Sequence, residues 1–96
     1  MAKLEYRKLS DGEVQAALAE LSGWSVDGGQ LCKTFPFRAY MDAFGFAFKI
    51  GNEAEQLNHH PDILIGYEKV TVRVNTHDVG GLSPYDFELA RLIDLI

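Results

Sequence analysis

The chain has 96 residues, the length of one domain with one hydrophobic core. Its hydrophobic share of 47% and charged share of 24% are typical of a globular protein and argue against disorder. Nine basic residues against fourteen acidic ones give a formal charge of −5, so direct binding to a nucleic-acid backbone is disfavoured. We therefore expect a single domain over residues 1–96 that binds no DNA or RNA directly.

The first part of the chain predicts a helix followed by two strands. Ser10 and Glu13 have the spacing of a capping box, and the helix that they open should end near Gly23. Its apolar residues recur at helical spacing: Val14, Ala17, Leu18 and Leu21. Residues 24–26 and 31–37 then read as strands around a glycine-rich turn. Three side chains of the second strand share one parity and should face the core: Leu31, Phe35 and Phe37.

A central helix, expected from Tyr40 to about Asn58, is apolar on two sides. One side carries Tyr40, Phe44, Phe48 and Gly51, and the other carries Ala43, Phe46, Ala47, Ile50, Ala54 and Leu57. An outer helix of a monomer should not be apolar nearly all round. Gly45 and Gly51 each cost about 1 kcal/mol relative to Ala, and a close helix–helix approach would compensate. We predict that one side packs on the sheet and the other on a second subunit, which makes the protein a homo-oligomer.

The second part of the chain predicts two more strands and a last helix. Residues 63–67 form the first of these strands, and three valines that alternate with polar residues form the next. Ser83, Pro84 and Asp86 then make a strong helix start, with Ser83 as N-cap. The order α-β-β-α-β-β-α predicts an α+β domain, in which a four-stranded antiparallel sheet carries the helices on one face.

We expect the protein to be cytoplasmic. The first ten residues are charged and lack the apolar stretch of a signal peptide. The most apolar stretch, residues 39–51, contains Asp42 and Lys49 and is too short to cross a bilayer. The single cysteine, Cys32, cannot form an intrachain disulfide, which fits a reducing compartment, and we interpret it as a packing residue.

All three histidines of the chain lie in one short stretch. His59 and His60 are adjacent and precede Pro61, and His77 ends the alternating valine strand. Imidazole exchanges protons near neutrality, so this concentration suggests a proton-transfer site. Glu55 shares a helix face with His59 if the helix reaches that far. Pro61 should end the helix and splay the two imidazoles apart.

Other interpretations of these residues remain open at this point. His59 and His60 could cap the helix carbonyls, and His77 could be an ordinary loop residue. Asp86 is explained by its role as a cap, and Tyr67 is more often a core aromatic. Zinc is disfavoured, because adjacent histidines chelate one ion poorly and no cysteine or further histidine completes a tetrahedral set.

A spaced pattern connects these residues along the chain. Glu55-x-x-x-His59-His60-Pro61 is followed after five residues by Tyr67, after nine more by His77 and after eight more by Asp86. The pattern resembles the signature of the pterin-4a-carbinolamine dehydratases, and further similar positions, Thr76 among them, extend the resemblance from about residue 31 onward. In one departure, Ile63 and Leu64 stand where many members carry an aromatic residue, which affects expected substrate affinity more than catalysis.

The resemblance implies an enzyme that acts after aromatic amino-acid hydroxylation. It would expel the hydroxyl on carbon 4a of a tetrahydropterin as water, with the pterin as substrate and no metal or redox cofactor. His59, His60 and His77 would surround the pterin, with His60 as the main proton-transfer residue. Glu55 would hold His59, and Asp86 would lie nearby while capping its helix. Pro61 and Tyr67 are the remaining supporting positions.

The resemblance also implies tetramers in which the central helices form a bundle, so we expect a homodimer or homotetramer. Some animal members of the family bind a homeodomain transcription factor. The alternative function is therefore a non-catalytic binding, assembly or coactivator protein on the same scaffold. Retention of all three histidines together with Glu55, Tyr67 and Asp86 favours the enzyme.

Overall fold

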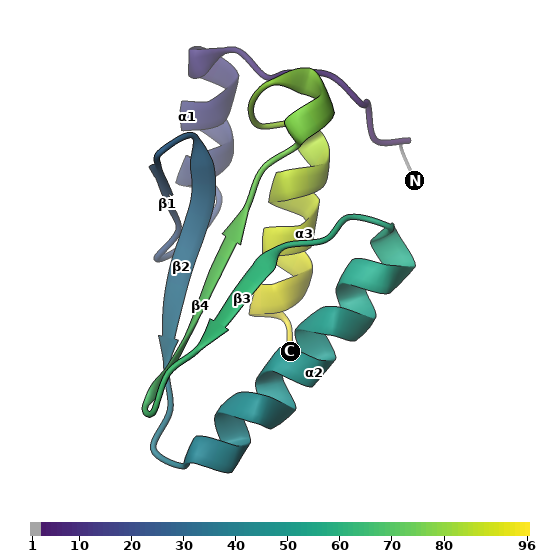
Figure 1. Cartoon of the computed structure of the whole chain (residues 1–96). Helices are drawn as coiled ribbons and strands as arrows, with labels where there is room; N and C mark the ends of the chain where they lie inside the picture. The colour runs from purple at the N-terminus through teal and green to yellow at the C-terminus, as the bar shows by residue number, and fades with distance from the viewer. Residues whose placement is uncertain (1–2) are drawn as a thin grey trace.

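The fold is that of a computed structural model, which describes residues 3–96. Met1 and Ala2, which begin the expected domain and its charged N-terminal stretch, lie outside the described residues. The elements follow the predicted order and confirm the α+β class (Figure 1). They are α1 (Asp11–Ala19), β1 (Ser25–Asp27), β2 (Gln30–Pro36), α2 (Tyr40–Leu57), β3 (Asp62–Ile65), β4 (Lys69–Val74), the 3₁₀ helix η1 (His77–Val79) and α3 (Pro84–Asp94). The sequence pattern did not predict η1.

The four strands form one antiparallel sheet in the order β1-β2-β4-β3. Each hairpin supplies one central and one edge strand, and β2 and β4 pair in the middle. In the register of that pair, Leu31 lies opposite Val74 and Phe35 lies opposite Val70. The end of β4 therefore lies beside the start of β2, and β4 leads directly into η1.

One face of the sheet carries the core, as the alternating valines predicted. Val70, Val72, Val74 and Leu31 are buried. They form one cluster with residues of α2 and α3: Ala43, Ile50, Ala54, Leu89, Ala90 and Ile93. Side chains of α1, together with Phe35 and Phe37, pack against the edge of this cluster. The residues of opposite parity, such as Thr34 and Thr71, lie at the surface or half-buried, so the helices share one face.

Both capping boxes are present. Ser10 and Glu13 cap α1, and Ser83 and Asp86 cap α3. The first helix is shorter than predicted and ends at Ala19. The backbone N–H groups of the next two residues bond to carbonyls three positions back, as in a 3₁₀ helix, so the α-helical pattern stops there. Gly23 lies in the bend beyond it with a φ of +81°, a conformation that favours glycine.

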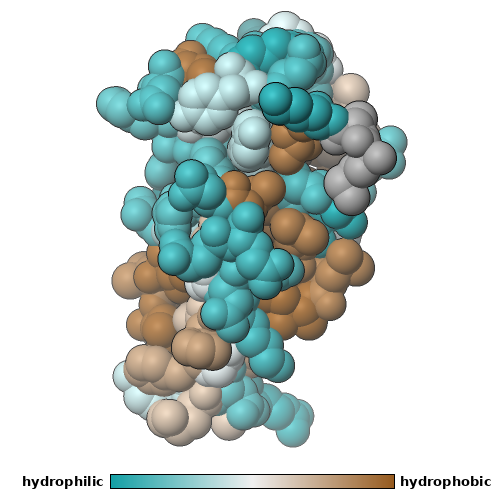
Figure 2. All heavy atoms as spheres, turned by 90° about the vertical axis from the view of Figure 1, so that its right-hand side faces the viewer, coloured by the Kyte–Doolittle hydropathy of each residue, from teal (hydrophilic) through white to brown (hydrophobic). Residues whose placement is uncertain are grey.

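The outer side of α2 is exposed and apolar. Tyr40, Met41, Phe44 and Phe48 all reach solvent, with 72% of Phe48 exposed. Figure 2 faces the side on which α2 lies in Figure 1 and shows hydrophobic side chains on both sides of a hydrophilic strip. A Cβ at Gly45 or Gly51 would meet no atom within 4 Å, so the described chain itself supplies no close neighbour there. The predicted second contact of this helix requires another molecule. No helix among residues 3–96 is long and apolar enough to cross a membrane.

Candidate active site

A shallow pocket beyond the C-terminal end of α2 brings all three histidines together. Its lining comes from the N-terminal segment, the end of α2, the residues between β4 and η1, and η1 itself. The lining residues are Tyr6, Asn58, His59, His60, Asn75, Thr76, His77 and Asp78. Because β4 leads into η1 beside the end of α2, residues that are far apart along the chain line one pocket.

Asn58 ends α2 and sets the direction of the two adjacent histidines. It adopts the left-handed conformation with a φ of 53°, which asparagine tolerates better than most residues. The His59 backbone N–H then bonds to the carbonyl of Ala54 at 3.0 Å, as in a Schellman-type helix end. His59 therefore lies outside the helix, and its side chain does not continue the helical face of Glu55.

His59 forms a buried pair with Asp86. The distance from His59 Nε2 to Asp86 Oδ1 is 2.6 Å, and the two side chains are 11% and 0% exposed. Asp86 is the third residue of α3 and accepts the Ser83 backbone N–H at 2.9 Å, so the capping residue also binds the imidazole. The prediction that Asp86 lies near the histidines while capping its helix agrees with this geometry.

Thr76 and Ser83 complete the hydrogen bonds around Asp86. Thr76 Oγ1 donates to Asp86 Oδ2 at 2.8 Å and lies 2.6 Å from Ser83 Oγ. Thr76 is buried, and its backbone N–H bonds to the carbonyl of Gly81, which ties the end of β4 to the start of α3. No buried side-chain nitrogen or oxygen of the described residues lacks a partner.

His60 pairs with Glu55, which corrects the predicted pairing of Glu55 with His59. The distance from His60 Nε2 to Glu55 Oε2 is 2.5 Å. The side chains are 56% and 77% exposed, so the pair lies in solvent and contributes little to stability. The left-handed conformation of Asn58 turns the chain after α2. As a result His60, instead of His59, reaches back to the last turn of the helix.

The N-terminal segment adds an aromatic wall that the sequence pattern did not indicate. The Tyr6 hydroxyl donates to Asp78 Oδ2 at 2.8 Å, and this hydrogen bond raises the pKa of Tyr6 above its ordinary value of 10.0. The Tyr6 ring packs edge-on against Tyr85, with centroids 5.6 Å apart, and the Tyr85 ring lies 5.8 Å from that of His59. Since Tyr6 and Asp78 are 72 positions apart, no local pattern could reveal this contact.

Tyr67 does not join the pocket within one chain. It lies between β3 and β4, is 75% exposed, and packs against Tyr40 at the first turn of α2. The histidine pocket lies at the other end of that helix, which is roughly 27 Å long. The alternative interpretation of Tyr67 as a core aromatic is also wrong. Pro61 connects His60 to β3, where Ile63 packs on the core and Leu64 faces solvent.

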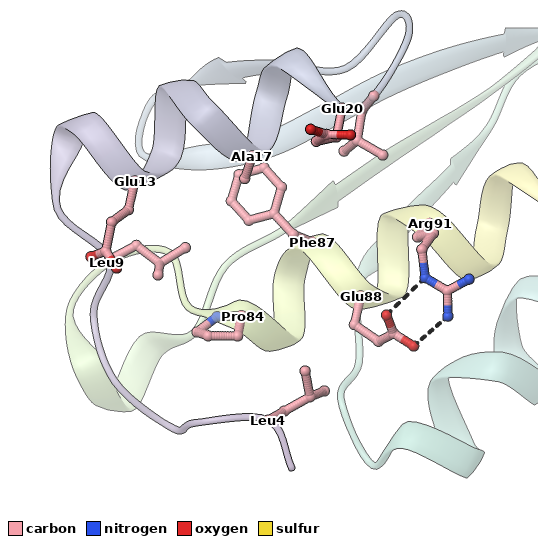
Figure 3. A pocket seen from close by; sticks show the side chains of 10 residues that line it. Leu4, Leu9, Glu13, Ala17, Glu20, Pro84, Phe87, Glu88 and Arg91 are labelled. Carbon is pink, nitrogen blue, oxygen red and sulfur yellow. Dashed lines mark hydrogen bonds and ion pairs between the residues drawn. The ribbon is translucent and has the colours of Figure 1, made fainter. Parts of the chain in front are cut away.

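A second hollow lies between the N-terminal segment, α1 and α3 (Figure 3). Its floor is apolar, with Leu4, Leu9 and Phe87 among the lining residues. It contains no histidine, and the Glu88 carboxylate at its rim is bound by the neighbouring Arg91. Proton-transfer chemistry therefore points to the histidine pocket. Within residues 3–96, no three His, Cys, Asp or Glu side chains are arranged to hold a metal ion.

Known proteins share the sequence pattern and the fold of this chain. Residues 7–96 match the family model described as pterin 4 alpha carbinolamine dehydratase. Relatives from Nostoc sp. and Sulfurisphaera tokodaii, each named "Putative pterin-4-alpha-carbinolamine dehydratase", are 44% and 42% identical over 88 residues. Each alignment covers 92% of this chain and 95% of the relative.

Two solved structures share the fold. The Brucella melitensis protein described as "transcriptional coactivator/pterin dehydratase" superposes with a TM-score of 0.87 at 34% identity, covering 93% of this chain and 97% of that one. A pterin dehydratase-like RuBisCO assembly factor of the alpha-carboxysome gives a TM-score of 0.60 at 20% identity, over 75% of this chain and 83% of the other, and shows the fold alone. By its sequence and its fold, the chain belongs to the pterin-4-alpha-carbinolamine dehydratase family.

Proposed function

We propose that this protein dehydrates 4a-hydroxytetrahydropterin to quinonoid dihydropterin and water. In this way it would recycle the pterin cofactor of aromatic amino-acid hydroxylases. The observation that carries the proposal is one pocket lined by three imidazoles, two of which are paired with carboxylates, in a chain of this family.

The reaction needs two proton transfers at neighbouring positions of the pterin ring. Hydroxide is a poor leaving group, so an acid must protonate the oxygen as its bond to carbon 4a breaks. The adjacent ring nitrogen must lose its proton as the new double bond forms. Imidazoles can both donate and accept protons, so they can supply both transfers, and each such transfer typically contributes a factor of about 10²–10⁴ in rate.

We assign the main proton transfer to His60. Its side chain is more than half exposed in the pocket, where a bound pterin can reach it, and Glu55 pairs with its Nε2 atom. His59 is held by Asp86, and His77 lies exposed at the start of η1, so these two would share transfer and orientation. Two differently placed imidazole–carboxylate pairs suit a reaction that needs one donor and one acceptor.

The test is dehydration of 4a-hydroxytetrahydropterin, generated in place by an aromatic amino-acid hydroxylase and followed by ultraviolet absorbance. Wild type is compared with His60→Ala and with Gln56→Ala, a matched control at an exposed position of α2 beside Glu55. We expect the His60 variant to lose roughly 10²-fold or more in kcat, while the control retains wild-type turnover.

The other outcomes divide the proposal into its parts. If His60→Ala retains turnover, the proposed dehydratase activity stands, and the main proton transfer is assigned to His59 or His77 instead. A folded wild type that does not exceed the spontaneous rate would exclude the dehydratase.

The exposed apolar side chains on the outer side of α2 support a second proposal, which concerns binding to other molecules. We propose that Tyr40, Phe44 and Phe48 join copies of the chain into a homodimer or homotetramer, since this row leaves large apolar side chains in solvent. A non-catalytic role in binding, assembly or coactivation would use the same row. The Brucella melitensis protein is described as a coactivator as well as a dehydratase, which supports testing both.

A further inference from the structure

The hydrogen bonds around Asp86 have only one arrangement of protons that satisfies every group. The Asp86 carboxylate can only accept, and three donors face it: His59 Nε2, the Thr76 hydroxyl and the Ser83 backbone N–H. Since Thr76 gives its single proton to Asp86, the hydroxyl of Ser83 must donate to Thr76 Oγ1. The Ser83 oxygen in turn accepts the backbone N–H of Tyr85 at 3.2 Å.

This arrangement determines which nitrogen of His59 is protonated. Nε2 faces a carboxylate and must carry the proton, so in the neutral ring Nδ1 is the proton acceptor. Among the described residues, Nδ1 has no hydrogen-bond partner. Every buried side-chain nitrogen of these residues has a partner, so Nδ1 is not buried. Nδ1 therefore reaches the surface, and His59 lines the pocket.

Thr76 is the residue through which this arrangement is held. It is nearly fully buried, donates to Asp86 Oδ2 at 2.8 Å, and lies 3.4 Å from His59 Nε2. Without its hydroxyl, Oδ2 would keep only the Ser83 N–H, and the carboxylate could turn away from the imidazole. Thr76 is not itself assigned a proton transfer to the substrate, because its hydroxyl is already bonded to Asp86 and Ser83.

We propose that Thr76 is a positioning residue that acts through Asp86. By fixing the carboxylate, it keeps the proton of His59 on Nε2 and presents Nδ1 to the pocket as a proton acceptor. The kinetic part of this inference rests on the proposed dehydratase activity, whereas the tautomer is a property of the free protein.

The first test reads the tautomer in the wild-type protein. Two-bond ¹H–¹⁵N correlation spectra distinguish a protonated ring nitrogen from an unprotonated one, and His60→Gln and His77→Gln spectra assign the His59 signals. We expect neutral His59 with its proton on Nε2. A proton on Nδ1 of His59 would overturn the proposal, and this result needs no substitution among Thr76, Ser83 and Asp86.

The second test removes the hydroxyl with Thr76→Val, which keeps the shape of the side chain. We expect a mixture of His59 tautomers and a loss of roughly tenfold in kcat with KM within about twofold, because one hydrogen bond is worth about that factor. Thr76→Ser, which restores the hydroxyl, should restore both. Thr71→Val is the matched control. It removes the hydroxyl of a threonine in β4, which pairs with Thr34 on the open face of the sheet, away from Asp86.

The outcomes separate positioning from structural support. A folded Thr76→Val protein with the wild-type tautomer and kcat would refute the proposal. If that variant does not fold, the Ser variant decides, because loss of the Nε2-protonated form there would also refute it. A wild type with the expected tautomer but no dehydration activity would retain the positioning role and exclude the proposed reaction.

Discussion

Replacing Asp86 with alanine is expected to cost about 3–5 kcal/mol of the free energy of unfolding. Asp86 is fully buried and accepts hydrogen bonds from three groups, of which the Ser83 N–H would have no other partner. An unpartnered buried N–H costs about 1–3 kcal/mol, and loss of a hydrogen bond to a charged group adds about 1.5–3 kcal/mol. Together these two terms give about 2.5–6 kcal/mol, a range that contains the expected loss and is a large part of a total stability of about 5–15 kcal/mol.

Glu55→Ala provides the matched control, since Glu55 is the carboxylate of the second imidazole pair but lies in solvent. Its loss should change the stability by about 0–1 kcal/mol. Urea unfolding followed by the fluorescence of Trp24, the single tryptophan and a buried one, measures both at one protein concentration. Equal losses in the two variants, or a loss below about 1 kcal/mol in Asp86→Ala, would refute the reasoning that burial makes the two pairs different.

Three further predictions concern other parts of the molecule. Because Asp78 raises the pKa of Tyr6, the stability that this bond contributes is present below about pH 10 and is lost as the phenol ionises. Asp78→Asn should move the Tyr6 titration, read from phenolate absorbance against Tyr6→Phe, towards lower pH, and an unchanged titration would contradict the contact. Arg7 and the Ser10 backbone lower the pKa of Glu13 from 4.5 to about 2, so its contribution exists above the higher value and is lost as pH falls through the lower one. Glu13→Gln should therefore lower the melting temperature at pH 7, with the difference shrinking towards pH 2. Phe48→Glu should give a monomer by light scattering where the wild type is oligomeric, and a monomeric wild type would exclude the interface.

The candidate site was predictable in its membership more than in its connections. His59, His60 and His77 could be grouped from their concentration in the chain, and Asp86 from its cap position and the family spacing. The partner of each imidazole was not predictable, because it depends on the left-handed Asn58 at the end of α2. Helical spacing assumes that the helix continues, and a single residue of opposite handedness invalidates that assumption.

Thr76 is one of the positions at which the chain resembles the family, but its role, like that of Tyr6, could not be predicted from a sequence pattern. A threonine just after a strand is ordinary, and the role of Thr76 arises only because β4 ends beside the start of α3. Tyr67 shows the opposite case, since its position in the spaced pattern suggested the site, while β3 carries the chain away from Pro61 to the far end of α2.

By itself, the sequence determined the element order, both capping boxes and the buried face of the sheet. These depend on residues within a few positions of one another, through side-chain periodicity and the hydrogen bonds of helix ends. Only the tertiary structure decided that His59 meets Asp86 and that Glu55 meets His60. His59 and Asp86 are 27 positions apart, and their contact exists because the sheet register and the position of α3 on the sheet bring the ends of two different elements to one place.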